Sequence, residues 1–110
     1  MNRDAIIRSQ KESIILRQVF DDFNPHYCFN LHGQRTIYSA GKSNSPSIIS
    51  FLSPSEDTKR SITKTRKKSM SIINAINSVL QLYLPNQVGR YDDSFNPNCV
   101  GDQFQTIGVP

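Results

Sequence analysis

The chain has 110 residues, of which 36% are hydrophobic and 20% charged, and its net charge is +4 at pH 7. This length suits one small domain and leaves no room for a second hydrophobic core. Two cysteines are too few for a disulfide-stapled secreted domain, and no apolar run has the length of a membrane span or of a signal-peptide core. We therefore expect an intracellular protein, cytoplasmic or nuclear, with free thiols and no membrane partner.

Residues 3–22 predict an N-terminal helix. Good helix formers dominate this stretch, Asn2 is a suitable N-cap, and the Asn24-Pro25 pair ends the helix. The apolar residues fall on two faces instead of one stripe. A helix of this kind packs against two neighbours, or against one neighbour and a second subunit.

Residues 26–40 predict an antiparallel β-hairpin. Its first half alternates apolar with polar residues, the apolar ones being Tyr27, Phe29 and Leu31. Gly33-Gln34 suits a two-residue turn with glycine in the first central position. Counting back from that turn places Phe29 opposite Tyr38, an aromatic cross-strand pair on the buried face.

The stretch from Ser53 to Pro85 predicts one long helix, preceded by a short third strand over residues 47–52. Ser53 is a natural N-cap, Glu56 completes the capping box, and Pro85 ends the helix. A helix from Pro54 to Leu84 would span ~46 Å at 1.5 Å per residue, more than a compact domain of this size accommodates. We therefore expect its charged first half to overhang the domain.

The predicted fold is α+β: an N-terminal helix, a small antiparallel hairpin or three-stranded sheet, one long C-terminal helix with a basic first half, and an irregular tail. Residues 1–85 form the single domain. Residues 86–110 are rich in turn residues and have no period, so we expect an extended or disordered tail. The tail residues expected to lie on the domain are Phe95, Phe104 and Ile107.

The first half of the long helix is strongly basic and contains no acid between residues 59 and 68. Its basic residues are Lys59, Arg60, Lys64, Arg66, Lys67 and Lys68. Arg60, Lys64, Lys67 and Lys68 share one helical face and form a row that can follow the phosphates of DNA or RNA. We therefore expect a small non-enzymatic regulatory or accessory protein that binds nucleic acid without sequence specificity. A solvated face that only maintains solubility is the plain alternative.

The second half of the long helix is uncharged and apolar. Its broad stripe covers the sheet and also offers a partner interface at Ile72, Ile76, Val79 and Tyr83. The alternative function is therefore a protein–protein interaction or assembly module, of the kind found in viral or phage accessory proteins. A chain this small has little core of its own, which favours a homodimer.

Two short patterns overlap the basic stretch. Residues 64–68 match a nuclear-import pattern, and residues 66–69 match a basophilic kinase site with Ser69 as the acceptor. A phosphate on Ser69 would add about two negative charges where the basic and apolar halves meet. Both patterns are short and occur frequently by chance.

We expect no metal, cofactor or catalytic residue. His26 and His32 flank Cys28 but would lie ~20 Å apart along an extended strand, which excludes shared zinc ligation. Residues 40–43, Ala-Gly-Lys-Ser, lack the first glycine of a phosphate-binding loop. A thiol-dependent enzyme built on Cys28 with one of these histidines remains a third, weaker alternative.

Overall fold

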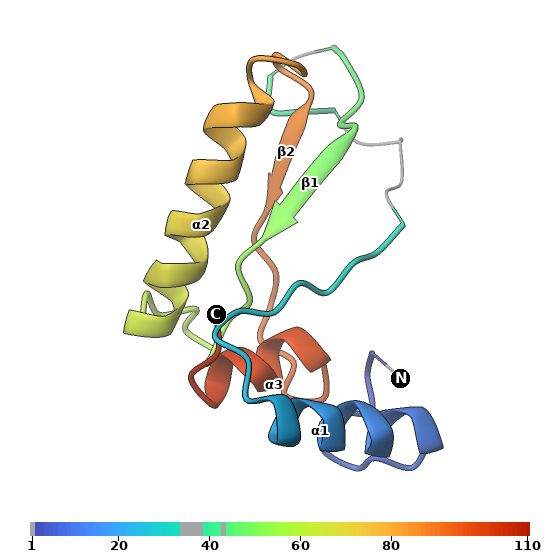
Figure 1. The fold of residues 1–110 in the computed structure, drawn as a ribbon. Helices are drawn as coiled ribbons and strands as arrows, with labels where there is room; N and C mark the ends of the chain where they lie inside the picture. The colour runs from blue at the N-terminus through green and yellow to red at the C-terminus, as the bar shows by residue number, and fades with distance from the viewer. Residues whose placement is uncertain (1, 34–38, 43) are drawn as a thin grey trace.

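The computed structural model describes residues 2–33, 39–42 and 44–110. These residues form three helices and two strands in the order α1, β1, α2, β2 and α3. Their bounds are Lys11–Phe23, Ile49–Leu52, Lys64–Leu80, Val88–Tyr91 and Val100–Thr106. Figure 1 shows α1 and α3 together at one end of the molecule, while α2 and both strands extend from there to the opposite end.

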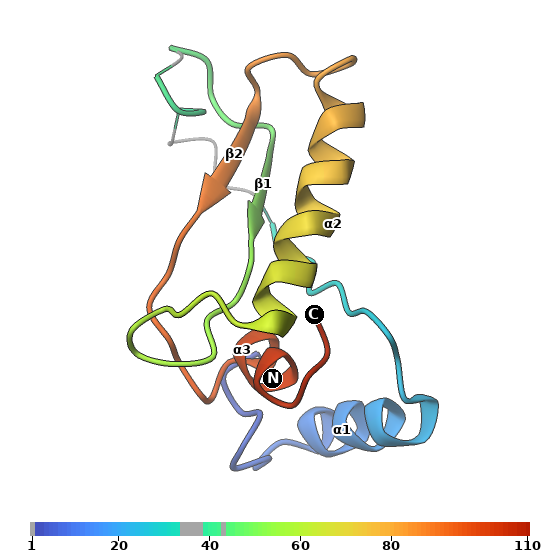
Figure 2. The ribbon, with the colours of Figure 1, turned by 90° about the vertical axis from the view of Figure 1, so that its left-hand side faces the viewer.

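The two strands and α2 form a β-α-β unit. β1 and β2 pair in parallel, with Ile49 opposite Val88 and Leu52 opposite Tyr91. Parallel strands cannot be joined by a tight turn and need a crossover connection, which α2 supplies. The helix runs beside the two strands in both views (Figures 1 and 2). The sheet is therefore parallel and two-stranded among the described residues, and the predicted antiparallel three-stranded sheet is wrong.

The N-terminal helix begins at Lys11, eight residues later than predicted. Arg8 has a left-handed backbone conformation with φ 52°, which a continuous α-helix does not accommodate. The carboxylate of Asp4 accepts hydrogen bonds from the backbone N–H groups of Ser9 (3.0 Å) and Gln10 (2.9 Å). These bonds lower the pKa of Asp4 to about 2. The residues before α1 are therefore a turn closed by Asp4, and Asn2 is not the cap.

The predicted long helix is also wrong, because α2 is 17 residues long and covers only ~25 Å. The predicted cap at Ser53 is replaced by Thr63, whose side chain accepts the backbone N–H of Arg66. Arg60 has a φ of 55° and interrupts any helix through this stretch. Residues 53–63 thus form a loop, and α2 ends at Leu80, with turns before Pro85.

The predicted hairpin does not form in the described residues of this stretch. Residues 26–33 belong to no strand and follow α1 as an extended segment (Figures 1 and 2). Gln34 and Tyr38, on which the predicted turn and cross-strand pair depended, lie outside the described residues. Residues 47–52 do contain a strand, β1, but its partner is β2, which lies in the predicted tail.

Instead of an irregular tail, residues 86–110 contain β2 and α3. Gly89 allows β2 to approach β1 closely, because a Cβ at this position would lie 2.6 Å from the hydroxyl oxygens of both Ser47 and Ser50. In α3, Phe104 is 9% exposed and stacks on Phe20 of α1 with ring centroids 4.0 Å apart. The C-terminal residues therefore supply both a strand and a packing surface.

Apolar burial is sparse in the described residues. The buried apolar side chains are Ala40, Val100 and Phe104. More of the buried residues are polar or charged: Asp4, Ser13, Ser47, Ser53, Ser55, Arg66, Ser69, Asp102 and Gln105. Buried polar groups stabilise a fold only through specific hydrogen bonds, so much of this fold depends on polar contacts.

Candidate functional site

The six basic residues predicted to bind nucleic acid lie around the start of α2. Five are exposed, namely Lys59, Arg60, Lys64, Lys67 and Lys68. The sixth, Arg66, is only 4% exposed. On α2, Lys64, Lys67 and Lys68 follow the spacing i, i+3 and i+4, so they form a row on the helix surface, here called the lysine row. The first turn of α2 contains no acidic residue, and the positive end of its dipole adds to this field.

Arg66 has turned from the surface to anchor the loop in front of its own helix. Its guanidinium donates to the carbonyl oxygens of Arg60 and Ser53, the latter at 3.4 Å, and to Asp92 Oδ1 at 2.9 Å. Ser69, one turn further along α2, donates to the hydroxyl of Ser53 at 2.8 Å. We call this group the Arg66 anchor. It ties residues 53–60 and the end of β2 to the first turns of α2.

Acidic residues reduce the positive field beside the lysine row. Asp92 pairs with Arg60 at 3.1 Å as well as with Arg66. The Glu56 carboxylate accepts the hydroxyl of Thr63. Hydrogen bonds from the side chain and backbone of Ser61 lower the pKa of Asp57 below its ordinary value. These carboxylates are held in place as hydrogen-bond acceptors, so the local excess of positive charge is smaller than the sequence suggested.

The predicted partner interface separates into a half-buried part and an exposed part. Ile72 and Ile76 are half-buried. Val79 is 56% exposed and Tyr83 76% exposed, and Leu82 between them, which the sequence analysis left out of the interface, is 78% exposed. We call Val79, Leu82 and Tyr83 the apolar end of α2. It lies at the end of the molecule opposite α1 and α3 (Figure 1).

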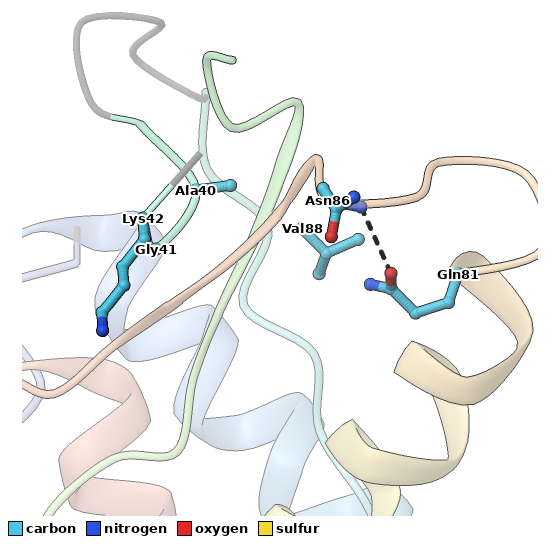
Figure 3. A pocket seen from close by; sticks show the side chains of 6 residues that line it. All are labelled: Ala40, Gly41, Lys42, Gln81, Asn86 and Val88. Carbon is cyan, nitrogen blue, oxygen red and sulfur yellow. Dashed lines mark hydrogen bonds between the residues drawn. The ribbon is translucent and has the colours of Figure 1, made fainter. Parts of the chain in front are cut away.

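A shallow hollow of about 530 Å³ lies close to this end of α2. Figure 3 shows Ala40, Gly41 and Lys42 on one side of it, and Gln81, Asn86 and Val88 on the other. The amide of Gln81 is already engaged, since it accepts from the Asn86 backbone at 3.3 Å and donates to Asn77 at 3.0 Å. Among the described lining residues Lys42 is the one charged group, and these residues do not converge on a ligand.

The two cysteines are free. Burial raises the pKa of the Cys28 thiol and is also the main cause of the raised pKa of Cys99. A raised pKa keeps a thiol protonated and makes it a weaker nucleophile. Both histidines beside Cys28 are exposed. Within the described ranges, no three His, Cys, Asp or Glu side chains are grouped so that they could hold a metal ion.

Sequence reasoning missed the Arg66 anchor. A basic residue among five others has no sequence signal that marks it as buried, because burial depends on a carboxylate distant in sequence, Asp92, and on the carbonyls of a loop. The position of Leu82 was missed for another reason. The predicted helix continued to Leu84, whereas the chain leaves α2 after Leu80 and turns Leu82 outward.

The chain matches no protein-family model, no curated protein and no solved structure. The search for membrane-crossing segments is also negative for the described residues, whose helices are too short or too polar to cross a bilayer.

Proposed function

We propose that this chain is a non-enzymatic protein-interaction module that binds a partner protein through the apolar end of α2. The observation that carries the proposal is the exposure of three large apolar side chains within five residues at one end of the molecule: 56% for Val79, 78% for Leu82 and 76% for Tyr83. A contiguous exposed apolar surface of this kind is typical of a protein-binding site.

The charge distribution supports the same proposal. No charged residue occurs between Ser69 and Gly89, whereas charged residues are frequent on both sides of this stretch. The centres of protein interfaces are depleted of charge and enriched in aromatic residues, and Tyr83 supplies such an aromatic anchor. A partner can therefore cover this end of α2 without burying an unpaired charge.

The total surface gives a second line of support. The molecule exposes 7936 Å², whereas a compact monomer of 12.5 kDa exposes about 6,200 Å². The excess, about 1,700 Å², is larger than the ~800 Å² that each partner contributes to a standard interface. An excess of this size leaves room for one partner interface, and the exposed side chains at the apolar end of α2 contribute to it.

A site-specific photo-crosslinker at position 82 tests the proposal in extract of the source cell. We expect it to yield a discrete protein adduct. The same label at Ile7, which is 71% exposed and lies far from α2 in sequence, is the matched control and should not yield that adduct. The isolated partner should then bind Leu82→Asp at least tenfold more weakly than wild type, and Ile7→Asp as tightly as wild type. Equal binding by all three proteins would refute the proposal.

Nucleic-acid binding is the second candidate, and the lysine row supports it. Lys64, Lys67 and Lys68 are all exposed, lie on one face of α2 and have no salt-bridge partner among the described residues. Three free ammonium groups at this spacing can contact successive phosphates. The held carboxylates of Glu56, Asp57 and Asp92 nearby make this the weaker candidate.

Binding to a generic duplex and to a single strand at low and moderate salt tests this candidate. Lys64/Lys67/Lys68→Glu should abolish salt-dependent binding. Lys11/Lys42/Arg90→Glu, which changes the net charge by the same amount at exposed positions, should retain most of it. If both variants lose binding equally, the attraction is a net-charge effect, and if wild type does not bind at low salt, the lysine row is only a solvated surface.

We also propose that the protein works inside the cell, in the cytoplasm or the nucleus. The free state of Cys28 and Cys99 supports this, because a reducing compartment maintains thiols. Fractionation of cells that produce the tagged protein would test the proposal, with recovery from the secreted fraction as the contrary result.

A further inference from the structure

The extended segment after α1 combines exposed apolar side chains with an unpaired backbone. Tyr27, Phe29 and Leu31 alternate along it and are 56%, 66% and 88% exposed. A segment in which alternate residues are apolar has the pattern of a strand with one buried face. Here more than half of each of these side chains is exposed.

One edge of this segment is marked by a backbone hydrogen bond to the last residue of the chain. The N–H of Cys28 donates to the carbonyl oxygen of Pro110 at 3.0 Å. In an extended chain the N–H and C=O of successive residues point to opposite edges. The backbone groups of Tyr27, Phe29 and Leu31 therefore point to the other edge, and they have no hydrogen-bond partner among the described residues.

We propose that this open edge pairs in antiparallel fashion with the same edge of a second copy of the chain, about a two-fold axis at Phe29. In that register Phe29 lies opposite Phe29 of the second copy, and Tyr27 lies opposite Leu31. Because these are alternate residues on one edge, every one of these pairs is a hydrogen-bonded pair, and the edge forms six backbone hydrogen bonds across the axis.

The side chains and charges fit the same partner. Directly opposite residues project from the same face of an antiparallel pair, so the two Phe29 rings adjoin and each Tyr27 adjoins a Leu31. No Asp, Glu, Lys or Arg occurs between Asn24 and Gly33, so the two edges meet without repulsion between like charges. The segment is thus complementary to itself in backbone hydrogen bonding and in charge.

The apolar area that this pairing would bury indicates how strong the dimer is. At the exposed fractions given above, the side chains of Tyr27, Phe29 and Leu31 expose roughly 400 Å² of surface in each copy. This is about half of the ~800 Å² per partner of a standard interface, so we expect a weak dimer that forms only at high protein concentration. The inference does not depend on the proposed function, because it concerns residues on a different segment from the apolar end of α2.

The self-paired position allows a decisive experiment by sedimentation equilibrium between about 5 and 500 µM. Phe29→Asp and Phe29→Lys each place two like charges directly opposite one another, so each variant alone should be monomeric over this range. An equimolar mixture of the two should associate again, because each heterodimer then contains one Asp–Lys pair. Phe29 is 66% exposed, so both variants should fold as wild type does.

Ile62→Asp, at a 61% exposed position in another loop, is the matched control and should associate as wild type does. Hydrogen exchange adds a second readout: the amides of Tyr27, Phe29 and Leu31 should become more protected as the protein concentration rises, while the amide of Asn30 should not. A monomeric wild type at 500 µM, unchanged association of Phe29→Asp, or failure of the mixture to associate would each overturn the inference. Protection that is independent of concentration would also overturn it, since it would indicate pairing within one chain.

Discussion

The junction between α1 and α3 is apolar, whereas the junction between the start of α2 and the end of β2 is polar. In the first, Phe104 stacks on Phe20 at 4.0 Å and is 9% exposed. In the second, the buried guanidinium of Arg66 connects the carbonyl of Ser53 with the carboxylate of Asp92. Both join segments distant in sequence, so each determines a part of the fold that local propensity cannot.

The difference shows how a chain with little apolar burial maintains its shape. An apolar contact is non-directional and tolerates rearrangement, whereas the Arg66 anchor needs each acceptor in its place. Water and salt weaken the polar junction more, because Asp92 has a side-chain exposure of 60%. The two junctions should therefore respond differently to substitution, salt and pH.

The largest loss of stability is expected from a substitution at the apolar junction between α1 and α3. Phe104→Ala should lower the free energy of unfolding by about 3 kcal/mol, because it removes a buried ring and leaves a cavity against Phe20. Urea denaturation followed by circular dichroism measures this loss. Phe23→Ala, at a 77% exposed position in α1, should cost less than about 0.5 kcal/mol. Similar losses in the two variants would show that the stack contributes no more than an exposed ring.

The second-largest loss of stability is expected at the Arg66 anchor. Arg66→Met keeps the bulk of the side chain but removes its charge-assisted hydrogen bonds, and we expect a loss of about 2 kcal/mol. Arg66→Lys should not restore stability, because one ammonium cannot reach the acceptors of a planar guanidinium. Hydrogen exchange should increase in residues 53–63 and not in α1. Lys67→Met, at the exposed neighbouring position, is the control, and a loss equal to that of Arg66→Met would contradict the anchor.

Asp4 makes the stability of the folded protein depend on pH. We expect this effect to be smaller than that of the Arg66 anchor. Its pKa in the folded protein is about 2, below the ordinary value of 3.8. The carboxylate therefore contributes stability above pH 4, and this contribution is lost as the pH falls towards 2. Asp4→Asn should be less stable than wild type at pH 7, and the difference should vanish near pH 2. Unfolding curves from pH 2 to 7 check this, and a difference that is constant with pH would contradict it.

Substitution of Asp102 should change the stability least. It should raise the stability at pH 7, whereas the other substitutions lower it. Burial raises its pKa, although its carboxylate accepts the Asn96 backbone N–H at 2.6 Å. The folded protein thus disfavours the charged form, and stability from this group falls as the pH rises through the raised pKa. Asp102→Asn keeps an acceptor oxygen for the Asn96 N–H and removes the buried charge, so it should be more stable than wild type at pH 7. The gain should disappear below pH 4, and destabilisation at pH 7 would contradict this reading.

Secondary structure was predictable only where local signals decide it. The uncharged apolar periodicity from Ile72 to Leu80 is part of α2, and the Asn24-Pro25 pair does follow the end of α1 at Phe23. The start of α2 was not predictable, because two acceptable caps compete. Ser53 fits a capping box, but its hydroxyl and carbonyl are used by Ser69 and Arg66, and Thr63 caps the helix instead.

The sheet was beyond the reach of sequence patterns. Residues 27–31 alternate more regularly than any other stretch, yet they form no strand, while the four residues of β2 show no such pattern. Strand pairing is a long-range event, and Gly89 reveals its role only beside Ser47 and Ser50. The same holds for the candidate site: the basic run and the apolar run were evident, but not which side chains face outward.

What the sequence by itself determined is therefore the distribution of charge and apolar residues: a basic cluster, an uncharged stretch behind it and a chain with little material for a core. These follow from composition and order alone. Only the tertiary structure decided that Arg66 turns inward, that Leu82 and Tyr83 turn outward and that the β1 partner comes from the last quarter of the chain. Burial and pairing depend on groups distant in sequence, and no local pattern contains that information.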